Sequence, residues 1–389
     1  MAQRTCGGVS RIDNDTIWPI SPHTVAKHHI LMKYVQAWAA IFATRSTGSN
    51  DRRFIYIDGF AGPGEYSNGE DGSPVVVLKS LKGHRSANKF LGTEFFNIFI
   101  EKNSNRAQNL EKVIKERIEP VPSWLKYRVI NGDFNSQLNS ILSEVEEGNK
   151  SLAPCFCFVD PFGWSDIDYD VLSRVMINKK AEILITFMAG YVERFVFDPM
   201  HIPSLEKLYS TQQLDSIRAS KNDENLVTKY FLENLTQKIK SNNEVSDLFT
   251  ISFAAYNNHN GLEYYLVYLT KHCKGFGVMK EAMFSSAKDG SYKFSDFDFD
   301  PNQKTLVDYG QEKIWLGLAS SDCYNVLVEV FGKGKKIPID QVKSTIICRT
   351  KWVYRAEILA KLEELDKIKV KIDKRRKGTY PDRGFIVLN

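Results

Sequence analysis

The first feature of the chain that can do chemistry is a glycine-rich turn after an apolar, strand-like run. The stretch "FIYIDGFAGPGEY" (54–66) carries Asp58, followed by Gly59, Gly62 and Gly64. Glycines at such a turn let the backbone approach a ligand closely. The dinucleotide spacing GxGxxG is not met, because a serine stands where its third glycine would fall, and no Gly-Lys-Ser/Thr phosphate loop follows. The turn therefore disfavours a nucleotide-dependent dehydrogenase and leaves two interpretations, a small-molecule site or a tight turn.

Three further acidic residues follow the next three predicted strands. Glu101 ends "NIFIE", Asp133 lies in "NGDF", and Asp160 opens "DPFG". The carboxyl ends of parallel strands share one edge, where open sheets bind their ligands. A carboxylate there can accept hydrogen bonds from a ribose diol or from the amine of an adenine ring. One such acid is as well explained by a solvated strand end or a helix cap, but four in this order indicate a binding constellation.

The elements that must position these acids alternate between strand and helix patterns. An amphipathic helix pattern begins near position 22, and apolar strands then alternate with helices up to about position 188. This order predicts a doubly wound, Rossmann-like α/β sheet covered on both faces. A helix-rich insertion is expected at about 191–247, followed by an antiparallel hairpin at the sheet edge, so that the α/β domain spans 1–303.

The last part of the chain, 304–389, predicts a small basic domain. Three short helical patterns end in two strands around a basic tip, which is the outline of a winged helix. From 331 to 389 the chain carries 16 Lys or Arg against 7 Asp or Glu. That excess favours a polyanion partner such as nucleic acid, although a solubilising surface explains it nearly as well. The predicted phosphate contacts surround Tyr380: Lys374, Arg375, Arg376, Lys377 and Arg383.

Composition narrows the remaining possibilities. No apolar run is long enough to span a membrane, and the N-terminal residues lack the features of a secretory signal. The six cysteines are scattered with no metal-ligand spacing, so we expect buried reduced thiols in a cytoplasmic protein and no metal. In "KHH" (27–29) we expect surface residues of a helix in preference to groups facing the site.

The order of these motifs resembles the class I S-adenosylmethionine-dependent methyltransferases. "DGFAGPG" looks like their first motif, in the form common among enzymes that act on nucleic acids. "DPFG" is similar to the Asp/Asn-Pro-Pro-Tyr/Phe motif of enzymes that methylate exocyclic amines, with Phe162 in place of the second proline. The resemblance implies S-adenosyl-L-methionine as cofactor. It assigns cofactor binding to Asp58, Gly59, Phe60, Gly62, Gly64, Glu101 and Asp133, catalysis to Asp160, Pro161 and Phe162, and stacking on an extruded base to Phe162 or Trp164.

The chain is closer still to the three-Cys-motif partner proteins (TcmP). The resemblance covers "HTVAKHHILMKYVQAWAAIF", "YIDGFAGPGEY", "GSPVVVLKSL", "FVDPFGWSDI" and "YYLVYLTKHCKGFGVMKEAM". It implies a protein partner with a three-cysteine, radical-SAM-like motif. Two functions follow as expectations: methylation of DNA or RNA at an amino nitrogen, or a non-catalytic methyltransferase fold that binds nucleic acid for that partner.

Overall fold

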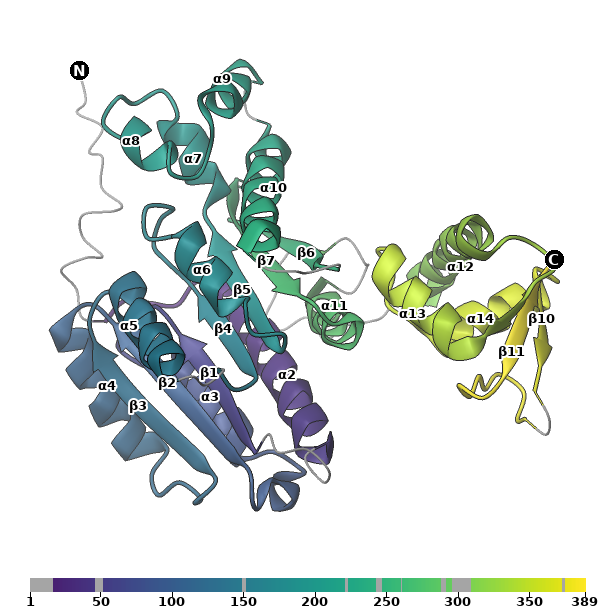
Figure 1. Cartoon of the computed structure of the whole chain (residues 1–389), viewed down its shortest axis with the longest axis horizontal. Helices are drawn as coiled ribbons and strands as arrows, with labels where there is room; N and C mark the ends of the chain where they lie inside the picture. Colours follow the sequence, from purple (N-terminus) through teal and green to yellow (C-terminus); the bar gives the residue numbers. More distant parts are fainter. Residues whose placement is uncertain are drawn as a thin grey trace.

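An eight-stranded sheet forms the centre of the larger part of the molecule (Figure 1). The computed structural model describes residues 17–45, 52–148, 152–220, 223–242, 247–259, 261–287, 292–295, 309–372 and 375–389. The strand order is β3-β2-β1-β4-β5-β7-β6-β8. The strands are β1 (Arg53–Asp58), β2 (Glu94–Glu101), β3 (Leu125–Asn131), β4 (Cys155–Val159), β5 (Ala181–Phe187), β6 (Phe249–Tyr256), β7 (Leu262–Thr270) and β8 (Lys293–Ser295).

The directions of the strands confirm the predicted doubly wound sheet with an antiparallel edge hairpin. Strands β1 to β5 are parallel where they pair, and β7 runs antiparallel to both β5 and β6. The sequence did not predict β8, a three-residue strand that pairs in parallel with β6. Such a short segment carries too few residues to show an alternating pattern.

Helices cover both faces of the sheet because its central strands are apolar on both sides. Along β1, Ile55 and Ile57 belong to one hydrophobic core, whereas Phe54 and Tyr56 belong to the other. This alternation follows from the two-residue period of a strand. Figure 1 shows α5 and α6 on the near side of the sheet. The helices up to β5, with one 3₁₀ turn, are α2 (Pro22–Arg45), α3 (Ser73–Lys82), η1 (Ala87–Phe90), α4 (Ser104–Arg117), α5 (Phe134–Glu147) and α6 (Tyr169–Val175).

Four helices occupy the stretch where the sequence predicts a helical insertion. They are α7 (Ala189–Phe195), α8 (Ile202–Leu205), α9 (Thr211–Ala219) and α10 (Glu224–Asn242). The insertion is packed onto the sheet, since Phe231 of α10 stacks on Phe187 of β5 with 3.9 Å between ring centroids. It therefore thickens the core near the end of β5.

The C-terminal part has its own core and lies beyond α11 (Cys273–Ala287), in yellow in Figure 1. Its elements are α12 (Tyr309–Phe331), β9 (Lys336–Pro338), α13 (Ile339–Arg349), α14 (Ala356–Glu364), β10 (Ile368–Lys371) and β11 (Phe385–Leu388). The three strands form an antiparallel sheet in the order β10-β11-β9, where the sequence predicts only two strands. The expected domain boundary at 303/304 lies outside the described residues.

Helix α11 ties the C-terminal part to the large sheet. The buried Lys280 ammonium donates hydrogen bonds to the carbonyl oxygens of residues 347, 350 and 352, at 3.0, 2.8 and 2.5 Å. Arg355 forms an ion pair with Glu281. A disulfide joins Cys273 at the start of α11 to Cys348 of α13.

The disulfide corrects the expectation of reduced thiols for two of the six cysteines. Cys155, Cys157 and Cys323 are free and buried, as expected, while Cys6 lies outside the described residues. Burial raises the pKa of the Cys155 and Cys157 thiols, so these two are unreactive packing groups. No helix within the described part of the chain is both long and apolar enough to cross a membrane.

Candidate functional site

Two of the predicted acids meet where the strand order of the sheet reverses. Asp58 ends β1, and Asp160 comes directly after β4, which pairs in parallel with β1. The chain leaves β1 toward β2 on one side and reaches β4 on the other. Open α/β sheets bind ligands in the crevice at such a switch point, outside the carboxyl ends of the strands. The sequence therefore placed these two acids at the correct edge of the sheet.

Asp58, the last residue of β1, is fully buried at this edge of the sheet. Its Oδ2 accepts a hydrogen bond of 2.7 Å from the Ser73 hydroxyl, and its Oδ1 accepts one of 3.3 Å from the Phe60 N–H. Burial raises the pKa of Asp58 from its ordinary 3.8 to about 7, and the nearby Asp160 charge adds to the rise. Both hydrogen bonds oppose the rise. The Lys27 charge opposes it too, and a ligand ammonium beside Asp58 would oppose it further.

The glycine turn is braced by Glu101. Gly62 and Gly64 have φ values of +64° and +83°, which side chains other than glycine rarely adopt. The Gly62 N–H donates to Glu101 Oε2 at 2.9 Å, and the Asn103 N–H donates to Oε1 at 2.7 Å. Each Glu101 oxygen keeps a second lone pair for a ligand hydroxyl. Nothing lies within 4 Å of a Cβ built on Gly62, so the turn has open space above it.

Asp133, Gly59 and Phe60 lie beside this turn. Asp133 is the N-cap of α5 and accepts a hydrogen bond of 3.1 Å from the Ser136 N–H, and its carboxylate is partly exposed. A Cβ on Gly59 would come within 2.4 Å of the Phe134 ring. Gly59 is therefore needed for close packing. Asp133 does not line the cavity described below, and its role toward an adenine ring stays a prediction.

Lys27 of α2 forms an ion pair with Asp160 inside the site. The Lys27 ammonium lies 2.5 Å from Asp160 Oδ2, and the two side chains are 8% and 20% exposed. His28 is also buried, and burial together with the Lys27 charge lowers its pKa to about 4. The expectation that these residues lie on the surface is wrong. The spacing could have predicted the burial of Lys27, because Lys27 stands four and seven positions before the apolar Leu31 and Tyr34 and so lies on the same, buried helix face.

A cavity of about 300 Å³ adjoins this ion pair, and Lys27 and Asp160 line it, whereas Asp58 and Glu101 do not. The segment before α2, the glycine turn and the residues after β4 form its walls. Phe162 is 44% exposed and meets Trp18 edge-on, with 5.7 Å between ring centroids. The Arg106 guanidinium lies over both rings, at 4.9 Å from Trp18 and 5.7 Å from Phe162. The residues that line the cavity include Trp18, Lys27, Gly62, Ser73, Asp160, Pro161 and Phe162.

Trp164 lies elsewhere, although the sequence suggested it for base stacking. Its ring is buried against Phe195 and His201 of the helical insertion, and its indole N–H donates to the Ser204 hydroxyl at 3.1 Å. A large ring just beyond the "DPFG" turn is thus drawn into the core of the insertion. Trp18, which the sequence did not single out, is the tryptophan that lines the cavity.

The loop between the glycine turn and α3 also belongs to the site. Arg117 of α4 forms ion pairs with Glu65 and Asp71 at the two ends of the loop. Tyr66 between them packs near Trp18 and His28, with ring centroids 6.1 and 6.0 Å apart. The loop is therefore held against the cavity.

The basic tip differs from its prediction in one respect. Arg375 is engaged within the domain, because it forms an ion pair with Glu363 and lies over Tyr380 at 5.2 Å from the ring centroid. Tyr380 is buried, so it is not an aromatic exposed between cations. Lys374 lies outside the described residues. The remaining predicted contacts are exposed: Arg376, Lys377 and Arg383.

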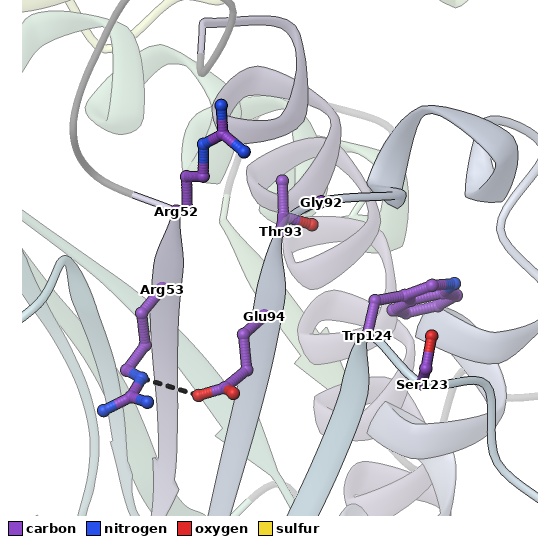
Figure 2. A pocket seen from close by; sticks show the side chains of 7 residues that line it. All are labelled: Arg52, Arg53, Gly92, Thr93, Glu94, Ser123 and Trp124. Carbon is purple, nitrogen blue, oxygen red and sulfur yellow. Dashed lines mark ion pairs between the residues drawn. The ribbon is translucent and has the colours of Figure 1, made fainter.

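A second hollow lies at the opposite edge of the sheet, where the strands begin (Figure 2). It is wide open, and its Arg53 is paired with Glu94 at 2.6 Å. The length of β1 separates it from Asp58. It has no part in the site described here. Among the described residues, no three His, Cys, Asp or Glu gather closely enough to hold a metal ion.

Comparisons with known proteins find only weak structural similarity. No protein-family model and no curated protein matches the chain. Trm1 from Pyrococcus horikoshii, in complex with S-adenosyl-L-methionine, is 10% identical over 95% of this chain and 91% of its own, with a TM-score of 0.37. The S-adenosylhomocysteine-bound methyltransferase PaMTH1 from Podospora anserina is 9% identical over 69% of this chain and 97% of its own, with a TM-score of 0.28.

A third solved structure extends well beyond the matched region. A putative methyltransferase from Porphyromonas gingivalis W83 is 11% identical over 59% of this chain and 40% of its own, with a TM-score of 0.27. All three TM-scores are below 0.5, so the fold assignment rests on the strand order. That order, with its antiparallel β7 and its cavity at the switch point, defines a doubly wound, Rossmann-like fold.

Proposed function

We propose that the chain is an S-adenosyl-L-methionine-dependent methyltransferase that acts on nucleic acid at an exocyclic amino nitrogen. The observation that carries the proposal is the convergence of Asp58, the glycine turn and the Lys27–Asp160 pair at the switch point. In this proposal Asp58, at the end of β1, serves the cofactor, and Asp160, after the adjacent strand β4, serves the substrate amine.

The residues present fit the cofactor. Lys27, whose charge also acts on the buried Asp58, is paired with Asp160, so Asp58 can accept the ammonium of the methionine moiety. The open space above Gly62 leaves room for the amino-acid end of that moiety. Glu101 retains lone pairs for the ribose diol, and Asp133 is assigned to the adenine amine. A cavity of about 300 Å³ is at the lower end of the usual range for small-molecule sites. When bound, S-adenosyl-L-methionine supplies a methyl group activated by a sulfonium.

The residues after β4 provide the acceptors for a substrate amine. An aromatic amine is a weak nucleophile because its lone pair is delocalised into the ring. Asp160, and the carbonyl oxygen of Pro161, can each accept a hydrogen bond from the NH₂ group, which directs its lone pair away from the ring plane. Asp160 carries its own ion pair, with the Lys27 ammonium 2.5 Å from Oδ2, and a carboxylate acceptor makes a stronger hydrogen bond than a neutral one. Phe162 and Trp18 offer ring faces for a flipped base.

The C-terminal part supports nucleic acid as the substrate. Its elements follow the order helix, strand, helix, helix, strand, strand, which is that of a winged helix. We interpret it as one, and the basic charge of 331–389 favours binding to a polyanion. Membership of the TcmP family and a radical-SAM-like protein partner belong to the same proposal, on the motifs quoted above.

One observation favours the alternative function, a non-catalytic fold that binds nucleic acid for its partner protein. Lys27 already occupies Oδ2 of Asp160, the predicted acceptor for the substrate amine. In a catalytic site this ion pair must leave Oδ1 accessible to the substrate. In a binding protein the pair would only stabilise the turn.

Methyl transfer distinguishes the two functions. Purified protein is incubated with S-adenosyl-L-methionine that carries a labelled methyl group, together with unmodified RNA or DNA. The proposal predicts label in one of the two polymers, and loss of transfer in Asp160→Ala with retained polymer binding. Binding of both cofactor and polymer without transfer, with and without the partner protein, would support the alternative.

A further inference from the structure

The C-terminal sheet has one face that the core does not use. Ile368, Ile386 and Leu388 point inward and are buried against the helices. Lys369 and Lys371 alternate with these inward residues along β10 and are exposed. The two-residue period of a strand places them on the opposite, outward face.

The strand register brings further groups onto this outward face. Lys369 pairs with Val387, which pairs with Lys336 of β9, and Lys371 pairs with Phe385. We call these five residues the lysine face. Lys369 and Lys371 are about 7 Å apart along the strand. The Lys336 ammonium lies 4.0 Å from the centroid of the half-buried Phe385 ring, so an aromatic surface lies among the cations.

The charge of the lysine face is not neutralised. Within the described residues, no ion pair joins Lys336, Lys369 or Lys371 to an acid, although other cations of the same domain are paired. Further exposed cations stand in the segments that flank β9, β10 and β11 in the sequence: Lys333, Lys335, Lys367, Arg376, Lys377 and Arg383. Like charges gathered on one surface repel each other, and a bound polyanion removes that repulsion.

Helix α14 carries the opposite charge. In a helix-turn-helix protein the second helix enters the major groove of DNA. Here Glu357 and Glu364 are exposed on α14, and Lys361 forms an ion pair with Glu364 at 3.1 Å. An acidic helix repels phosphates. The nucleic acid is therefore expected at the sheet and not at this helix.

We propose that the lysine face binds a single-stranded segment of nucleic acid, with the lysines at its phosphates and Phe385 and Val387 against a base. An aromatic side chain among cations on the face of a sheet suits an unpaired base and the phosphates beside it. This proposal rests on the proposed function in taking nucleic acid as the substrate. It adds the surface and the single-stranded form.

The test is a salt titration of oligonucleotide binding to the full chain. Fluorescence anisotropy of labelled, unstructured 20-nucleotide RNA and DNA is followed between 50 and 200 mM salt. In the Lys336→Ala/Lys369→Ala/Lys371→Ala variant, the slope of log affinity against log salt should fall by about 2, because each phosphate contact on a single strand contributes about 0.7. The same number of exposed lysines replaced on α4 and α10 (Lys112, Lys115 and Lys229) should leave the slope unchanged.

If the oligonucleotides bind, three results would overturn the proposal. They are an unchanged slope in the lysine-face variant, an equal loss in the control variant, and tighter binding of duplex than of single strands by the wild-type protein. Phe385→Leu preserves the fold and the charge, and it should weaken binding several-fold with an unchanged slope, because stacking on a base is lost. No binding of either oligonucleotide would also contradict the proposal and would point to a protein partner on this face.

Cofactor binding separates this proposal from the proposed function. The lysine-face variant should bind S-adenosyl-L-methionine as the wild type does, since its residues lie in the other domain. Oligonucleotide binding without any cofactor binding would refute the methyltransferase and leave the lysine face. Cofactor binding and methyl transfer with an unchanged lysine-face variant would refute the lysine face alone.

Discussion

The Lys27–Asp160 ion pair should make an unusually large contribution to stability for a pair at the edge of a cavity. Two unit charges about 4 Å apart attract by about 4 kcal/mol where the effective dielectric constant is about 20. The pair is closer, at 2.5 Å between nitrogen and oxygen, but Asp160 is 20% exposed and partly screened. We therefore expect a coupling energy of about 2 to 3 kcal/mol.

A double-mutant cycle measures this coupling directly. Lys27→Met and Asp160→Asn are made singly and together, and the free energy of unfolding is obtained from urea titrations followed by tryptophan fluorescence. Each single substitution leaves a charge with little solvent and no partner, so each should destabilise the protein more than the double variant does. The exposed pair Lys229–Glu233, at 3.9 Å, is the matched control and should show at most about 0.5 kcal/mol. A coupling for Lys27–Asp160 no larger than that of the control would refute this view of the site.

Three further predictions concern the Asp58 carboxylate, two tryptophans and the disulfide. Burial raises the pKa of Asp58 from 3.8 to about 7, so between these pH values the native state binds a proton that the unfolded state does not, and the protein loses stability as the pH rises. Without cofactor, Asp58→Asn should therefore be more stable than the wild type at pH 8, by on the order of 2 to 4 kcal/mol, and equally stable near pH 4. A stability difference that does not change with pH would contradict this. Trp164→Ala should lower the free energy of unfolding by about 3 to 5 kcal/mol because it leaves a cavity in the core. Trp18→Ala should change the free energy of unfolding by less than about 1 kcal/mol and should weaken cofactor binding. Equal destabilisation by both substitutions would show that Trp18 is a core residue. Mass spectrometry after alkylation of the denatured protein should find two more modified cysteines with reductant than without, because of the Cys273–Cys348 disulfide, and equal numbers would exclude that bond.

The sequence predicted the parts of the site that follow strands. Asp58 and Asp160 come directly after apolar runs, and parallel strands bring such positions to one edge whatever the details of packing. The glycine turn could be recognised for a separate, local reason, because the positive φ values of Gly62 and Gly64 demand glycine.

Groups that reach the site from distant parts of the chain were missed or misplaced. Lys27 and Trp18 lie before the first strand, and only the packing of α2 against the sheet brings them to Asp160 and Phe162. Trp164 follows the motif closely in sequence, but the insertion helices draw its ring into their core. No local pattern contains such long-range contacts.

Charge counting also had a limit. The excess of basic residues in 331–389 was visible, but the sequence did not show which cations are paired. Arg375 is engaged by Glu363, whereas Lys369 and Lys371 emerge on one face only through the strand register. A basic composition therefore indicated a partner without locating its surface.

Calorimetric titration of S-adenosyl-L-methionine and S-adenosyl-L-homocysteine into the purified chain tests the central claim most directly. We expect micromolar binding that is lost in Asp58→Ala and preserved in Asp215→Ala, since Asp215 is an exposed acid on α9. Absence of binding to folded, monodisperse wild-type protein, or binding that Asp58→Ala leaves intact, would contradict a cofactor site at the end of β1.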